Sequence, residues 1–126
     1  MREIDEIGAT LHRLGRMLFD RDTAFADQFA EDGLLVGSEP GEIAAGREAI
    51  RTMVGALFDR PARYIWDWRS IDIRVDGDIG WLFAEGEAVR ADRDGRTGVP
   101  YRLSAVLGWD GALWRWRLFH GSEPKG

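Results

Sequence analysis

Residues Trp109 to Ser122 read Trp-Asp-Gly-Ala-Leu-Trp-Arg-Trp-Arg-Leu-Phe-His-Gly-Ser. Aspartate followed by glycine, as in Asp110-Gly111, suits a tight turn in which a residue takes a positive φ angle. The tryptophans that alternate with arginines behind this turn are typical of a β-strand. The stretch therefore predicts a hairpin whose second strand is rich in aromatic residues.

Two more Asp-Gly pairs, at Asp76 and Asp94, repeat this turn signal nearer the middle of the chain. The three turns divide the second half into four predicted strands, roughly Arg63–Val75, Ile79–Ala91, Thr97–Trp109 and Ala112–Gly121. Strands of about 10 to 13 residues are about twice the usual length, and such strands twist and bend in a small domain. We therefore expect a curved sheet that wraps around helices.

Helical spacing of apolar residues dominates the first half. Steps of three and four predict an amphipathic helix over residues 4–20. Asp22 would cap a second, shorter helix that ends at Asp32-Gly33. A short strand at residues 34–36 and a third helix from about Gly46 to Asp59 follow. The chain is therefore predicted to be α+β, with three N-terminal helices before the sheet.

The composition predicts one domain over residues 1–126, with 44% hydrophobic and 31% charged residues. A net charge of −5, with the arginines spread along the chain, argues against a nucleic-acid partner. No apolar run is long enough to span a membrane, and the acidic N-terminus is unlike a signal peptide. We expect a cytoplasmic protein.

The chain has no cysteine and two histidines, which excludes disulfides, thiolate catalysis and multi-histidine metal sites. Phosphate-binding glycine loops, metalloprotease helices and nucleophile elbows are also absent from the sequence. We therefore expect no metal and no cofactor.

Four segments spread over the chain carry a family resemblance: Phe25 to Gly33, Gly46-Arg-Glu-Ala-Ile50, Gly77-Asp-Ile-Gly-Trp81 and Trp114 to Ser122. With their order and spacing, the chain resembles the nuclear transport factor 2-like superfamily, in particular its SnoaL-like branch. The resemblance implies a cone-shaped domain in which three helices and a strongly curved, mostly antiparallel sheet enclose a pocket. It also implies a homodimer through the outer face of the sheet, but no single activity.

Ketosteroid isomerase, an enzyme of that superfamily, has a similar Gly-Ser-Glu-Pro loop. Its catalytic aspartate and the aspartate and tyrosine of its oxyanion hole match about Gly37, Arg102 and Gly15 or Arg16 here. None of the three groups is present. We therefore expect no steroid isomerisation by that mechanism.

Strict alternation on the last strand places Trp114, Trp116, Leu118, His120 and Ser122 on one face, which we expect to point inward. An inward His120 would act as a general acid or base near neutral pH. The alternative is a buried histidine that only forms a structural hydrogen bond.

Arg102 and Ser104 share a face of the preceding strand. An inward Arg102 would need a carboxylate, either from an anionic ligand or from Glu85 or Glu87, because an unpaired buried charge is costly. The two glutamates share a face with Trp81, where they would line the pocket or lie in solvent.

Trp66 and Trp68 share one face of their strand, while the following apolar residues, Ile71 to Val75, have the opposite parity. Such a strand carries a bulge or buries one face against a partner. Core or dimer contacts are the simpler role for these tryptophans, and ligand contact is the alternative.

Three hypotheses follow: a dimeric pocket protein that binds a small, largely apolar molecule, a cofactor-free lyase, isomerase or hydrolase, and an interaction domain whose pocket is filled by its own tryptophans. The candidate catalytic residues are His120, Arg102 and Glu85. The candidate ligand-binding residues are Trp66, Trp68, Trp81, Ser104, Trp116 and Leu118.

Overall fold

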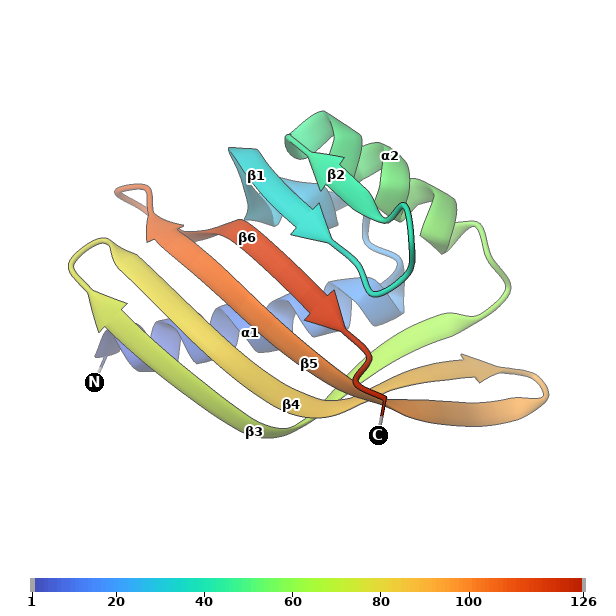
Figure 1. Ribbon diagram of the computed structural model, residues 1–126. Coiled ribbons are helices and arrows are strands. Elements are labelled where there is room, and N and C mark those ends of the chain that lie inside the picture. Colours follow the sequence, from blue (N-terminus) through green and yellow to red (C-terminus); the bar gives the residue numbers. More distant parts are fainter. Residues whose placement is uncertain (1, 126) are drawn as a thin grey trace.

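A computed structural model describes residues 2–125 and shows helices packed on one face of a single curved sheet (Figure 1). The helical elements are α1 (Arg2–Asp20), the 3₁₀ helix η1 (Thr23–Gln28) and α2 (Arg47–Phe58). The strands are β1 (Phe29–Val36), β2 (Ile43–Ala45), β3 (Arg63–Asp76), β4 (Ile79–Asp92), β5 (Gly95–Trp109) and β6 (Trp114–Ser122). The α+β prediction, with helices ahead of the long strands, is confirmed.

The six strands are ordered β2-β1-β6-β5-β4-β3. All neighbours are antiparallel except β1 and β6, which run parallel, so the sheet is mixed. In Figure 1, α1 lies behind the long strands, while η1 and α2 lie near β1 and β2. The three long hairpins turn where the Asp-Gly pairs predict, with Gly77, Gly95 and Gly111 at positive φ.

The helices predicted in the first half are present, but the second one is shorter than predicted. The apolar stripe of α1 is buried, and the Asp22 side chain accepts the backbone N–H of Ala24, as a helix cap does. The second helix ends at Gln28 rather than at Asp32-Gly33, because the chain already enters β1 at Phe29. Phe25 and Phe29 are nevertheless both buried, with ring centroids 6.0 Å apart.

A bulge in β3 confirms the prediction made from its two apolar sets. The pairing of β3 with β4 shifts between Trp68 and Ser70, which leaves Arg69 as the extra residue. The shift turns Ile71, Ile73 and Val75 to the same side as Trp66 and Trp68, and all five pack against the core. One strand can therefore cover the helices along its whole length.

A second bulge, in β6, overturns the expected alternation of the last strand. Its pairing with β5 shifts between Val106 and Leu107, which leaves Arg117 as the extra residue. Trp116 points inward as expected, but beyond the bulge Phe119 is the buried residue, at 2% exposure. Leu118, His120 and Ser122 therefore lie on the outer face of the sheet.

Candidate functional site

The three predicted catalytic residues share the outer face and do not reach the interior. His120 is exposed, between Val36 of β1 and Ser104 of β5, and Ser104 is exposed as well. The expectation that His120 points inward is wrong, because the β6 bulge reverses the face on which it lies. Their catalytic roles stay predictions.

Arg102 and Glu85 form the ion pair that the sequence offered as one alternative. Arg102 Nε lies 3.2 Å from Glu85 Oε2, and the two side chains are 51% and 48% exposed. An exposed pair of this kind contributes little to stability. Since Arg102 points out and already has a carboxylate, it gives no basis for an anionic ligand in the interior.

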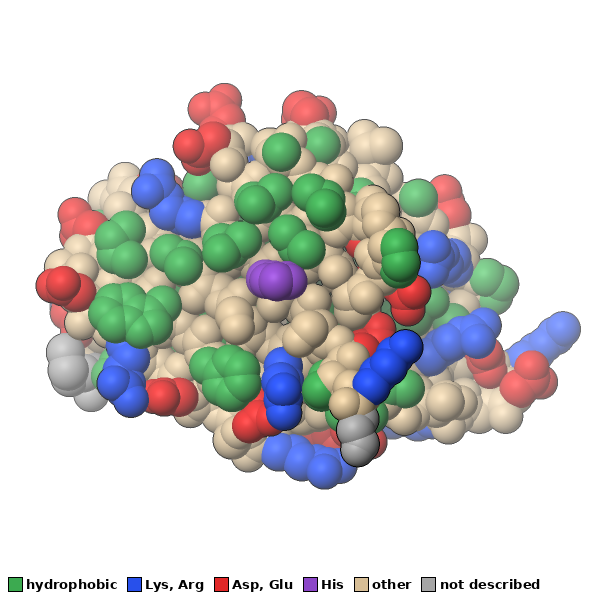
Figure 2. Space-filling model, in the orientation of Figure 1, with side chains coloured by type: hydrophobic (Ala, Val, Ile, Leu, Met, Phe, Trp, Pro, Cys, Tyr) green, Lys and Arg blue, Asp and Glu red, His purple; other side chains and the backbone are tan. Residues whose placement is uncertain are grey.

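Mostly apolar side chains occupy two further rows of the outer face, which run across the strands. One row passes from Ile43 through Val36, His120 and Ser104 to Phe83. Figure 2 shows hydrophobic side chains gathered around a histidine on this face.

The second row of the outer face runs from Ala45 through Leu34, Leu118 and Val106 to Trp81. The predicted ligand residues Trp81 and Leu118 therefore lie on the outer face of the sheet. Trp81 is 44% exposed, whereas Leu118 is half-buried.

Of the other predicted ligand residues, Ser104 lies on the outer face, while Trp66, Trp68 and Trp116 meet on the inner face. We call Trp66, Trp68, Tyr101, Trp116 and Phe119 the inner cluster. The Trp66 ring centroid lies 5.2 Å from that of Phe119 and 6.5 Å from that of Tyr101, and Trp68 lies 6.1 Å from Tyr101. Phe119 in turn lies 5.6 Å from Trp116. Trp66 and Trp68 stay partly exposed at the edge of this cluster.

The deepest ring of the inner cluster carries an unpaired donor. Trp116 is fully buried, and within the described residues its Nε1 has no hydrogen-bond partner. Buried donors without an acceptor are rare and costly in folded proteins. A ligand atom or a water molecule beside Trp116 would satisfy this group.

Polar groups that the sequence did not single out border the inner cluster where β1 and β6 end. We call Ser38, Glu42 and Glu123 the acidic end. Ser38 donates a hydrogen bond to Glu123, and Glu42 accepts the backbone N–H of Glu39 at 2.9 Å. Tyr101 lies against Gly121, where any Cβ would overlap the tyrosine hydroxyl.

The acidic end acts on Tyr101 through its charge. Burial is the first cause that raises the pKa of the Tyr101 hydroxyl, and the charges of Glu42 and Glu123 raise it further. The side chain of Trp66 offsets part of this rise. The hydroxyl is therefore neutral in the physiological range and is available as a hydrogen-bonding group.

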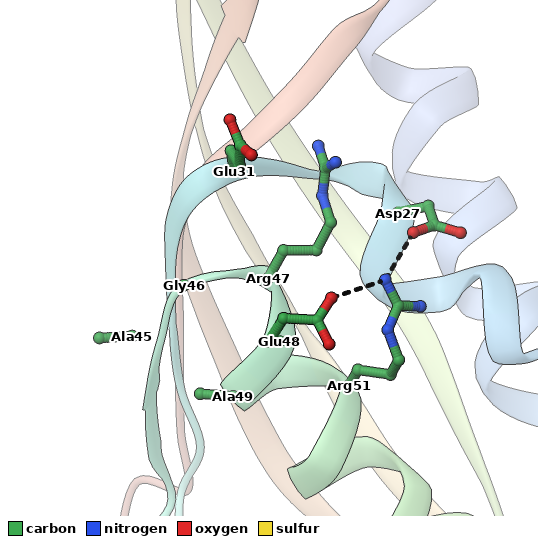
Figure 3. Close-up of a pocket in the computed structure, with 8 residues that line it drawn as sticks. All are labelled: Asp27, Glu31, Ala45, Gly46, Arg47, Glu48, Ala49 and Arg51. Carbon is green, nitrogen blue, oxygen red and sulfur yellow. Dashed lines mark hydrogen bonds and ion pairs between the residues drawn. The ribbon is translucent and has the colours of Figure 1, made fainter.

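Two surface hollows lie elsewhere. The first, of about 330 Å³, lies at the N-terminus of α2, where Figure 3 shows Arg51 between Asp27 and Glu48. Arg51 Nη2 lies 2.9 Å from Asp27 and 3.5 Å from Glu48. The hydrogen bond from Arg51 lowers the pKa of Asp27. Arg51 is therefore already paired with two carboxylates.

The second hollow, of about 430 Å³, lies beside the β5–β6 turn and includes Trp109 and Asp110. The pKa of Asp110 falls to about 2, first because it accepts the backbone N–H of Leu113, then because of Arg115 and the N–H of Ala112. These bonds hold the turn, so the carboxylate has a structural role.

Within residues 2–125, no group of three or more His, Cys, Asp or Glu side chains could hold a metal ion. No described helix is both long and apolar enough to cross a membrane.

Comparison with known proteins matches the SnoaL-like domain over residues 7–125. A protein of unknown function from Mycobacterium tuberculosis superposes with a TM-score of 0.87 at 22% identity, covering 98% of this chain and 73% of that one. An NTF2-like protein of unknown function from Pseudomonas putida gives 0.85 at 15% identity, with 99% and 89% covered.

A Catenulispora acidiphila protein in complex with S-DNPA gives a TM-score of 0.83 at 18% identity, covering 94% of this chain and 91% of that one. At these identities the likeness shows the fold alone. A search of curated proteins finds no match.

Proposed function

The chain belongs to the SnoaL-like domain family, and we propose that it is a homodimer that binds a small, largely apolar molecule at the inner cluster. The observation that carries the binding proposal is the position of Trp66 and Trp68. Both rings pack against the buried core, yet both stay partly exposed. Aromatic faces that solvent still reaches favour an apolar ligand.

Two further observations support binding here. The ring of Trp116 lies next to Phe119 in the same cluster, and its unpaired Nε1–H would donate a hydrogen bond to a polar atom of a ligand. A structural neighbour from Catenulispora acidiphila was solved in complex with S-DNPA, so a protein of this fold forms such a complex.

A neutral naphthalene tests the binding proposal. We expect 2-naphthalenemethanol to bind in isothermal titration calorimetry, and Trp68→Ala to weaken binding about tenfold because one ring face is lost, equivalent to about 1.4 kcal/mol. Trp109→Ala is the control, since Trp109 is also partly exposed but lies beside the β5–β6 turn. No binding, or an equal loss in the control, would show the proposal to be wrong.

The outer face supports the dimer. Its two apolar rows cross five strands, and the Arg102–Glu85 ion pair lies along one edge. An apolar centre with a charged edge is the usual composition of a protein interface, and a monomer rarely exposes so continuous a patch. A second copy would cover Trp81, Phe83 and Ile43, which solvent otherwise reaches.

We expect the purified chain to sediment as a dimer and Phe83→Glu to sediment as a monomer. Burying an unpaired carboxylate in an apolar interface should weaken the dimer at least thirtyfold, equivalent to about 2 kcal/mol. Leu113→Glu is the matched control, since Leu113 is 44% exposed against 42% for Phe83 but lies in the β5–β6 turn. A monomeric parent chain, or a Phe83→Glu dimer as tight as the parent's, would contradict the assignment.

A further inference from the structure

The acidic end places two carboxylates beside the inner cluster, and neither is paired with a positively charged side chain among the described residues. In the described part of the chain, neither Glu42 nor Glu123 belongs to any ion pair. Each is fixed instead by a neutral donor, the backbone of Glu39 for Glu42 and the Ser38 hydroxyl for Glu123. The two negative charges are therefore held in place and unmatched.

A buried polar group lies between these carboxylates and the rings. Tyr101 is 7% exposed, and its hydroxyl meets the chain at Gly121, two residues before Glu123. Among the hydrogen bonds of residues 2–125, none is donated by this hydroxyl to an acceptor. Burial first, and then the charges of Glu42 and Glu123, raise the pKa of Tyr101, so both carboxylates lie within electrostatic reach of its hydroxyl.

Aromatic rings and carboxylates favour the same kind of ligand group. The face of an indole or phenol ring attracts a cation, and a nearby carboxylate attracts it more strongly. An anion at this place would meet two negative charges that, among the described residues, no ion pair offsets, and Arg102 points to the outer face. The chemistry of the site is thus selective for positive charge.

We propose that the ligand of the inner cluster carries a protonated amine, which lies between Glu42 and Glu123 against the Tyr101 hydroxyl while its apolar body covers Trp66 and Trp68. This inference rests on the proposed binding function and adds the class of ligand to it. The amine supplies the counter-charge that the two carboxylates lack, and the Tyr101 oxygen accepts one of its hydrogen bonds.

Three probes with one ring system test the ligand class: 2-naphthalenemethylamine, 2-naphthalenemethanol and 2-naphthoate, which are cationic, neutral and anionic at pH 7. We expect calorimetry to rank the amine about tenfold tighter than the alcohol and the carboxylate weakest. The advantage of the amine should fall as salt is added, because ions screen partly exposed charges.

The double variant Glu42→Gln/Glu123→Gln should remove the advantage of the amine and leave binding of the alcohol unchanged. Glu39→Gln, in the same loop but with an exposed side chain, should keep the full advantage. An alcohol that binds as tightly as the amine would overturn the amine proposal and leave the proposed function standing. If none of the three probes binds, both are wrong.

Discussion

Phe119→Ala is expected to destabilise the protein by about 3–5 kcal/mol, because it removes a buried ring and leaves a cavity in the inner cluster. Phe119 contacts Trp66, Trp116 and Phe29, with ring centroids 5.2, 5.6 and 6.5 Å away. Urea unfolding followed by circular dichroism measures the loss. It should appear as a lower midpoint with an unchanged slope.

The neighbouring residue provides the control for this prediction. Leu118→Ala should cost about 1 kcal/mol, because Leu118 is only half-buried and lies on the outer face. Both variants are best compared in the Phe83→Glu background, where the dimer does not contribute to stability. A larger cost at Leu118 than at Phe119 would mean that β6 has no bulge at Arg117 and that His120 points inward.

Gly86→Ala should destabilise the protein by about 2–3 kcal/mol or more, because its Cβ would overlap the backbone of β3. Gly86 lies opposite the β3 bulge, and any Cβ there would overlap the carbonyl oxygen of Asp67 and lie 2.9 Å from the Cα of Trp68. Backbone atoms held in a ladder on both sides cannot move aside as the tip of a side chain can. Thermal and urea unfolding measure the cost.

Gly55→Ala is the matched control for Gly86→Ala, because it adds the same methyl group where no neighbouring atom is in the way. Gly55 lies in α2 with no atom within 4 Å of its Cβ position, so alanine should stabilise the protein by about 0.5–1 kcal/mol through helix propensity. A Gly86→Ala variant as stable as the parent would show that the two strands separate more easily at the bulge than their pairing indicates.

The two bulges show what the sequence could and could not predict. In β3 the apolar residues change parity between Trp68 and Ile71, so the sequence itself carries the signal. In β6 the adjacent residues Leu118 and Phe119 are both apolar, and either could follow Trp116 as the next residue on the inner face. Only the register with β5, whose Leu103 and Leu107 are fully buried, decides between them.

The acidic end could not be predicted for a different reason. Ser38 and Glu123 are 85 positions apart, and no local pattern connects them. They meet because β1 and β6 are parallel neighbours, so that the C-terminal ends of both strands lie side by side. The short strand β2, which turns Glu42 back over Gly37, was not predicted either.

The place of β6 in the strand order bears on how the chain folds. β6 lies between β1 and β5, and Leu35 pairs with Phe119, so the two halves of the sheet have no shared neighbour until the last strand is in place. Contacts between such distant residues slow folding, because a long loop must close before they form. During synthesis, β1 and β2 would therefore stay unpaired with β3, β4 and β5 until β6 has left the ribosome. The sheet would close in one late, cooperative step when β6 emerges.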